Sequence, residues 1–185
     1  GALLHVGGET FSLRRFDKQG RYAGLQTNTS CAAGTGSFLD QQAGRLRLSG
    51  ISRLANVAAE NKGGIPKIAS RCAVFAKTDL IHAQQEGYSL AEICDGLCRG
   101  LARNIVDTVF KHEMPDPPVI FCGGVARNPA VIAHISEMTG RHLVVDELAP
   151  LYGAVGAALS WMAENRVAPG TAFSMPLPQH RQVVC

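Results

Sequence analysis

Short apolar runs separated by glycine or charged turns open the chain. Residues 2–6 form one such run, and apolar and polar positions then alternate within 10–16 and 22–26. Alternation with a period of two is typical of half-buried strands, and Gly or Asp-rich breaks between strands indicate tight turns. The pattern therefore predicts an antiparallel meander of three strands.

Apolar positions recur every three or four residues in the middle of the chain, which predicts helices. Ser89 followed by Glu92 is a capping box that starts the longest of them. We expect helices over about 36–46, 51–60, 78–87 and 89–109. The apolar stripe of the longest helix, which we expect to be buried, is formed by Leu90, Cys94, Leu97, Cys98, Leu101, Ile105 and Val109.

The last third of the chain alternates strands and helices. A continuous apolar run at 119–122 is typical of a buried parallel strand. We expect a helix from Asn128 to Gly140, a strand at 142–145 and a helix at 152–163. This order predicts an α/β fold with a mixed sheet and helices on both faces. We expect one domain over residues 1–168 and a loosely ordered, proline-containing tail over 169–185.

Composition excludes several classes of function. The net charge of +3 is carried by scattered Lys and Arg residues and aromatic residues make up 6%, so we expect no nucleic-acid partner. No leader-like or long apolar segment occurs, so we expect no membrane partner. The six cysteines include no Cys-x-x-Cys pair, which favours a reducing, cytoplasmic location over a disulfide framework.

Three glycine turns each follow a predicted strand: Gly7-Gly8, Gly34-Thr35-Gly36 and Gly123-Gly124. Glycine lets the backbone approach a ligand closely, and backbone N–H groups at helix starts suit phosphate. One such turn is weak evidence, but three at the same sheet edge indicate a nucleotide cleft. Neither a Walker motif nor a strict Gly-x-Gly-x-x-Gly motif is present.

The other chemically active residues give no catalytic arrangement. Cys31 stands at a helix start, where the helix dipole favours a thiolate, although a buried turn cysteine fits the same pattern. Cys94, Cys98 and Cys122 fit core positions. The six histidines are dispersed, and we assign none of them as a ligand. We interpret Asp40, Asp79 and Asp95 as helix-surface or cap residues, and we assign no catalytic residue.

Four stretches, in order, closely resemble one ATPase family: CAAGTGSFL at 31–39, SRCAVFA at 70–76, GGVARN at 123–128 and GAVGAAL at 153–159. These are the activators of 2-hydroxyacyl-CoA dehydratases and the related ATPase subunits of benzoyl-CoA reductase. The resemblance implies one ribonuclease-H-like half of an actin-like fold. It also implies ATP/ADP with Mg²⁺, and an acyl-CoA dehydratase or reductase as the electron acceptor.

The same resemblance assigns the site residues. Cys31 and Cys72 would be metal ligands, two from each protomer, to a 4Fe-4S cluster shared across a homodimer. The nucleotide-binding residues would be Gly7, Gly8, Glu9, Gly34, Thr35, Gly36, Gly123, Gly124, Asn128 and Gly153, with Gly123, Gly124 and Asn128 on the adenosine side.

Two departures from the family pattern qualify these expectations. The chain begins at what resembles the second phosphate loop, so we expect the second half of an ATPase module, inactive without the first half. His5 stands where many relatives carry an acidic residue, which leaves Glu9 as the candidate acid of this loop. The alternatives are a sugar or metabolite kinase of the same fold and a degenerate, non-catalytic dimerisation domain.

Overall fold

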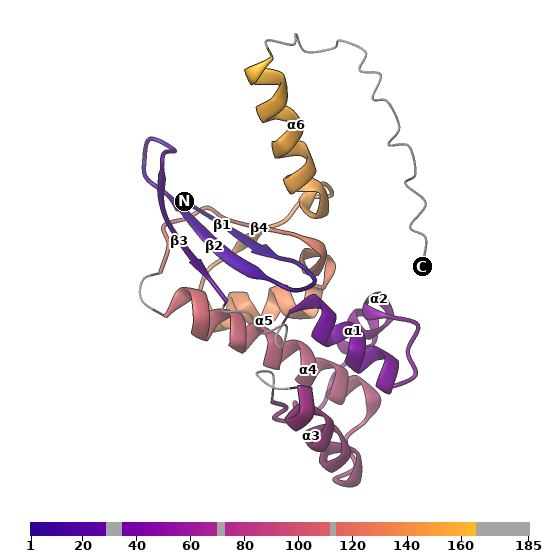
Figure 1. Ribbon diagram of the computed structural model, residues 1–185. Helices are drawn as coiled ribbons and strands as arrows, with labels where there is room; N and C mark the ends of the chain where they lie inside the picture. Colours follow the sequence, from indigo (N-terminus) through magenta and orange to yellow (C-terminus); the bar gives the residue numbers. More distant parts are fainter. Residues whose placement is uncertain (29–34, 70–72, 112–113, 166–185) are drawn as a thin grey trace, which may run out of the picture. The chain divides into compact units, whose positions relative to one another are not determined.

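The structure is a computed structural model that describes residues 1–28, 35–69, 73–111 and 114–165 (Figure 1). The chain divides into two compact units, Gly1–Tyr152 and Gly153–Cys185. The first unit contains the sheet and most of the helices. The described part of the second unit belongs to helix α6 (Tyr152–Glu164), which was predicted at 152–163.

A five-stranded mixed sheet forms the first unit, in the order β3-β2-β1-β4-β5. β1 (Ala2–Val6), β2 (Phe11–Phe16) and β3 (Tyr22–Thr27) form the predicted antiparallel meander. β4 (Val119–Cys122) lies parallel to β1, and β5 (Leu143–Val144) lies parallel to β4. This arrangement confirms the α/β class and the mixed sheet.

Register explains which face of the sheet is buried. Leu4 pairs with Leu13 on one side and with Phe121 on the other, and all three side chains are fully buried. Side chains alternate between the two faces of a strand, so neighbouring His5 lies on the opposite face. The alternation of apolar and polar positions in β1 therefore fixes its register.

Helices α4 (Leu90–Ile105) and α5 (Pro129–Thr139) contact each other and lie along one face of the sheet (Figure 1). Three further helices group around the N-terminal part of α4: α1 (Gly36–Arg45), α2 (Ile51–Ala59) and α3 (Ala73–Gln85). A π-helical segment, Val106–Phe110, continues α4, and two short 3₁₀ helices complete the unit, Gly124–Arg127 and Ala149–Leu151.

The predicted helix boundaries hold where the sequence carries a local capping signal. Ser89 Oγ accepts a hydrogen bond from the Glu92 amide, and the Glu92 carboxylate accepts one from the Ser89 amide. At the C-terminus of α5, Gly140 has a φ of 63°, which glycine tolerates best. Both boundaries were predicted from these residues.

Three details of the prediction are wrong. α3 begins at Ala73 and not at Thr78. β5 has two residues in place of the four predicted. Leu90 was expected in the buried stripe of α4, but it is the first residue of the helix and is 43% exposed, while Ile93 is buried instead.

Candidate nucleotide-binding site

Glycine turns meet around a cavity of about 280 Å³ in the first unit. Gly7 and Gly8 follow β1, Gly124 follows β4, and Gly36 begins α1. Because β1 and β4 are parallel, the turns that follow them reach the same edge of the sheet. Ser37, Asp40, Ile51 and Val125 complete the lining of this glycine-turn cavity.

Main-chain hydrogen bonds fasten the first turn of α1 to the turn after β1. The amide of Gly36 donates to the Gly7 carbonyl at 3.0 Å, and the amide of Ser37 donates to the Gly8 carbonyl at 2.8 Å. A Cβ at Gly36 would lie 2.9 Å from the Gly7 oxygen and 3.2 Å from Val125 Cγ2. Glycine at position 36 therefore permits the contact between the two segments.

Two amides of the turn between β1 and β2 have no acceptor among the described residues. The Gly7 amide closes the turn on the Thr10 carbonyl at 2.8 Å. The amides of Gly8 and Glu9 donate to no partner within the described residues. Successive unpaired amides of this kind are suited to binding an anion such as phosphate.

Gly123 and Gly124 have different structural requirements. Gly123 has a φ of 95°, and a Cβ there would lie 2.3 Å from the Val6 carbonyl oxygen. Its amide also donates to the Ala149 carbonyl at 2.9 Å. A Cβ at Gly124 would meet nothing within 4 Å. Gly123 thus joins β4 to the end of β1, while Gly124 leaves open space in the cavity.

Asn128 supports the turn that follows β4. Its side-chain oxygen accepts hydrogen bonds from the amides of Ala130 at 3.1 Å and Val131 at 3.2 Å, which caps α5. Its amide nitrogen lies 3.4 Å from Cys98 Sγ, and only 3% of the residue is exposed. Direct contact of Asn128 with a nucleotide stays a prediction.

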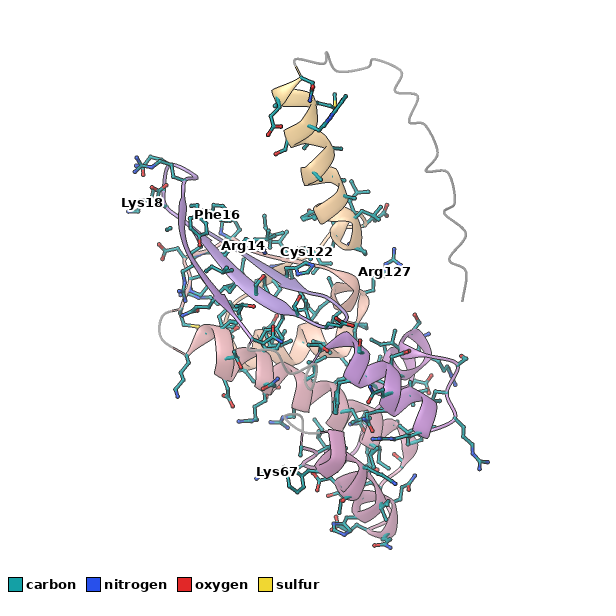
Figure 2. The ribbon with its side chains drawn as sticks, in the orientation of Figure 1. Arg14, Phe16, Lys18, Lys67, Cys122 and Arg127 are labelled. Carbon is teal, nitrogen blue, oxygen red and sulfur yellow. The ribbon has the colours of Figure 1, made fainter. Side chains whose placement is uncertain are left out.

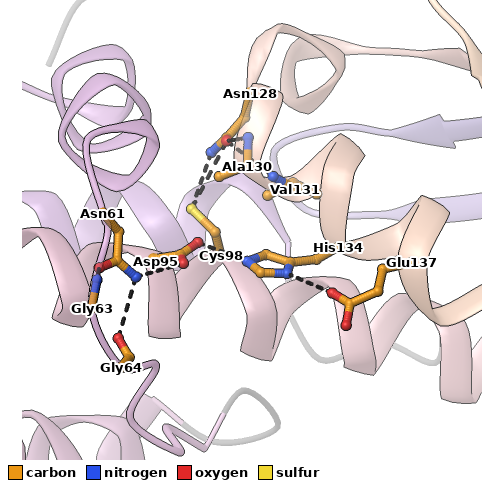
Figure 3. Close-up of polar contacts among 10 residues, drawn as sticks. All are labelled: Asn61, Gly63, Gly64, Asp95, Cys98, Asn128, Ala130, Val131, His134 and Glu137. Carbon is orange, nitrogen blue, oxygen red and sulfur yellow. Dashed lines mark hydrogen bonds and ion pairs between the residues drawn. The ribbon is translucent and has the colours of Figure 1, made fainter.

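A buried polar network ties α5 to α4 and to the loop after α2 (Figure 3). The Nε2 atom of His134 lies 2.7 Å from Asp95 Oδ1, and Asn61 donates to Asp95 Oδ2 at 2.9 Å. Asp95 and His134 are 8% and 7% exposed. Our interpretation of Asp95 as a surface or cap residue is therefore wrong, because α5 and the loop cover its helix face.

His5 lies beside the glycine-turn cavity, on the sheet face opposite Leu4. It pairs in register with Ser12 on β2 and Cys122 on β4. Burial and then the nearby guanidinium of Arg14 lower the pKa of His5 below its usual 6.5. Figure 2 labels Arg14 and Cys122 on this sheet. A histidine carries no negative charge in either protonation state, so His5 does not give this turn a carboxylate.

The predicted core cysteines are confirmed as buried. Cys94 and Cys98 have no exposed surface, and Cys122 is 2% exposed. Burial raises the pKa of Cys94 to about 11 and that of Cys98 to about 12. Thiols held in the neutral form are poor metal ligands, because a metal binds the thiolate.

The chain matches the BadF/BadG/BcrA/BcrD ATPase family over residues 2–160. It belongs to this family. Over 157 residues it is 31% identical to the (R)-2-hydroxyglutaryl-CoA dehydratase activating ATPase of Acidaminococcus fermentans, covering 85% of this chain and 59% of that protein. Over 157 residues it is 29% identical to the 2-hydroxyisocaproyl-CoA dehydratase activator of Clostridioides difficile. The aligned region covers 85% of this chain and 58% of that activator.

A solved structure shares the fold of this BadF/BadG/BcrA/BcrD family member. It is the activator of the 2-hydroxyisocaproyl-CoA dehydratase from Clostridium difficile with bound ADPNP, and it superposes with a TM-score of 0.82 at 26% identity. The match covers 95% of this chain and 64% of that chain. The resemblance inferred from the sequence motifs is confirmed, and the chain spans less than two thirds of the length of these relatives.

The structure does not test the roles of several residues that the family motifs assign. Cys31, Gly34 and Cys72 lie outside the described residues. Gly153 belongs to the second unit. Thr35 is fully buried before α1, and Glu9 is exposed on the β1–β2 turn. The roles assigned to these residues stay predictions.

Sequence reasoning missed two polar residues of the cavity wall, Ser37 and Asp40. Both lie on α1, and Asp40 follows Gly36 by four positions, so it shares the helix face that begins at the cavity. This spacing was the signal that could have identified Asp40.

No group of three or more potential metal ligands gathers in the part of the chain that the structure describes. Nor does any described helix have the length and apolar character needed to cross a membrane.

Proposed function

We propose that this chain is the nucleotide-binding, iron–sulfur-carrying part of an activator. In this activator, ATP hydrolysis drives low-potential electron transfer to an acyl-CoA dehydratase or reductase. The observation that carries the nucleotide site is the meeting of three glycine turns at one cavity in a member of an ATPase family. The ADPNP in the structurally similar activator supports the same site.

The residues around the cavity fit a nucleotide with Mg²⁺. The unpaired amides of Gly8 and Glu9 would hold phosphate oxygens, and the open space at Gly124 leaves room for the ligand beside the backbone. Asp40 lines the cavity with a carboxylate, and Glu9 adds a second nearby in sequence to the turn. Carboxylates commonly hold Mg²⁺ through its bound waters.

A pair of glycine substitutions on α1 tests this site. In Gly36→Ala the methyl group would press on the Gly7 carbonyl, whereas in Gly44→Ala it would meet nothing within 4 Å. We expect Gly36→Ala to weaken ADPNP binding at least about tenfold, equivalent to about 1.4 kcal/mol. Gly44→Ala should bind as the parent does. Isothermal titration calorimetry measures both, and equal affinities would refute the assignment of this cavity to the nucleotide.

The family motifs around Cys31 and Cys72 support the cluster proposal. The buried thiols of Cys94 and Cys98 have raised pKa values, which make these two residues poor ligands. A cubane cluster usually takes four thiolates, so two cysteines per chain require a homodimer. After anaerobic iron reconstitution, we expect a brown dimer that Cys31→Ala or Cys72→Ala abolishes and Cys94→Ala retains. Loss of iron in Cys94→Ala alone would contradict this assignment. A colourless, iron-free protein would favour a kinase or a non-catalytic dimerisation domain.

We further propose that residues 1–168 are the second half of an ATPase module. The described residues form one five-stranded sheet, which supports this proposal, because the expected cleft lies between two such halves. This half alone should then hydrolyse no ATP, since one wall of the cleft contributes only part of the binding energy. A phosphate-release assay tests the expectation, and full turnover by this chain would contradict it.

A further inference from the structure

A second and larger cavity, of about 620 Å³, lies between α4 and the loop at residues 65–69. It shares no lining residue with the glycine-turn cavity. Its volume falls in the range of small-molecule sites. Nothing in the proposed nucleotide or cluster function uses this cavity.

Glycine on α4 explains why the cavity exists. The loop lies so close to the helix that a Cβ at Gly96 would be 2.7 Å from the Pro66 carbonyl oxygen and 3.1 Å from Ile68 Cδ1. Gly100, one helical turn later, also lines the cavity. The absence of side chains at these positions lets the loop form one wall while α4 forms the other.

Positive charge gathers around this space. Lys67 comes from the loop, and Arg99 and Arg103 come from successive turns of α4. None of the three forms an ion pair within the described residues. Asp107 is the one carboxylate among the described lining residues, so the positive charges exceed the negative charges by two.

A buried amide also faces the cavity. Asn104 lines it, and 8% of the residue is exposed. Its side-chain amide has no hydrogen-bond partner among the described residues and keeps surface accessible to solvent, so it can bind water or a ligand. Asn104 therefore gives the cavity a polar contact of its own, next to Arg103.

We propose that this cavity binds a small molecule that carries a diphosphate group. A guanidinium presents a planar fork of donors that matches phosphate oxygens, and Arg99 and Arg103 place two such forks one helical turn apart. Lys67 adds a point charge from the opposite wall, and Asn104 adds a neutral donor. Ile65 and Ile68 provide apolar surface for the organic part of the ligand.

Inorganic pyrophosphate is the probe for this site. It is titrated calorimetrically into the purified protein and, in parallel, into Gly124→Ala, which changes the glycine-turn cavity and leaves the second cavity untouched. We expect saturable binding that Gly124→Ala does not weaken. Arg99→Gln and Arg103→Gln should each weaken it at least about tenfold, because a hydrogen bond to a charged group typically contributes that much.

Lys18→Gln is the matched control, since it removes the same charge from an exposed turn that Figure 2 shows at the opposite end of the unit from Lys67. This variant should bind pyrophosphate as the parent does. The melting temperature of each variant is compared with that of the parent protein. Affinities are then compared only among variants that are folded. Citrate is titrated in parallel as a carboxylate of similar charge.

Four results would overturn the proposal. Without saturable binding, the cavity is not an anion site. Equal weakening by Lys18→Gln would show that pyrophosphate responds only to net charge, and weakening by Gly124→Ala would place pyrophosphate in the glycine-turn cavity. Citrate binding as tight as pyrophosphate binding would assign the cavity to carboxylates, such as those of an acidic protein segment. None of these results depends on whether the nucleotide proposal is correct.

Discussion

Adjacent glycines after β4 should respond in opposite ways to the same substitution. Gly123 has a φ of 95° and a ψ of 175°, a region that is essentially limited to glycine, and a Cβ there would lie 2.3 Å from the Val6 carbonyl oxygen. Holding alanine in such a conformation costs about 1–3 kcal/mol. Moving β1 to relieve the overlap costs about 1–3 kcal/mol more.

We therefore expect Gly123→Ala to lower the free energy of unfolding by about 2–6 kcal/mol, a large part of the 5–15 kcal/mol of an ordinary domain. In Gly124→Ala the methyl group would meet nothing within 4 Å, and Gly124 has no positive φ. That substitution should leave stability unchanged or raise it by up to about 1 kcal/mol.

Urea unfolding followed by circular dichroism measures both variants, with the m-value checked for constancy. If Gly123→Ala lowers the free energy of unfolding by less than about 1 kcal/mol, the loss is smaller than the least cost expected from backbone strain alone. That result would refute the close approach of this turn to β1. Because Gly124 lines the cavity, Gly124→Ala should also weaken ADPNP binding while it remains folded. Unchanged ADPNP affinity in this variant would show that the ligand does not use this part of the cavity.

Three other predictions concern the core, the buried network and pH. Leu101→Ala, at a fully buried position, should destabilise the protein by about 2–5 kcal/mol in urea unfolding. Leu90→Ala, at a position that is 43% exposed, should cost much less, and equal losses would contradict the observed face of α4. Asp95→Ala should cost about 1–3 kcal/mol because it leaves Nε2 of the buried His134 without its partner and removes one hydrogen bond of the half-buried Asn61, and the exposed Asp116→Ala is the control that should cost nothing measurable. Burial, and then Arg14, lowers the pKa of His5 below 6.5, so its contribution to stability is present above pH 6.5 and is lost as the pH falls through the lowered pKa. His5→Asn should therefore flatten the dependence of the urea midpoint on pH in this window, and an unchanged profile would exclude His5 as its source.

Local signals made much of the fold predictable. Ser89 with Glu92, and Gly140, fix helix ends through contacts within a few residues, and the alternation in β1 specifies which side chains face the core. The predicted start of α3 lay too far along the chain because the prediction relied on Thr78 and Asp79 as a start signal. In the structure the helix already runs through both of these residues.

Features that depend on contacts distant in sequence were not predicted. Asp95 and His134 are separated by 39 residues, and nothing in the pattern of either helix shows that they meet. The glycine turns were predicted to share one sheet edge because strand direction follows from the order of elements. The requirement for glycine at position 36 depends on the position of Gly7 in space, which the local sequence does not reveal.

The attachment of α1 to the β1–β2 turn has a consequence for how the protein can vary. Both hydrogen bonds, from Gly36 to Gly7 and from Ser37 to Gly8, join main chain to main chain. Side-chain replacements at Glu9, which is exposed, change the chemistry presented to a ligand without removing either bond. Side chains of this turn can therefore vary without loss of the main-chain connection between the turn and α1, provided that position 36 carries no side chain.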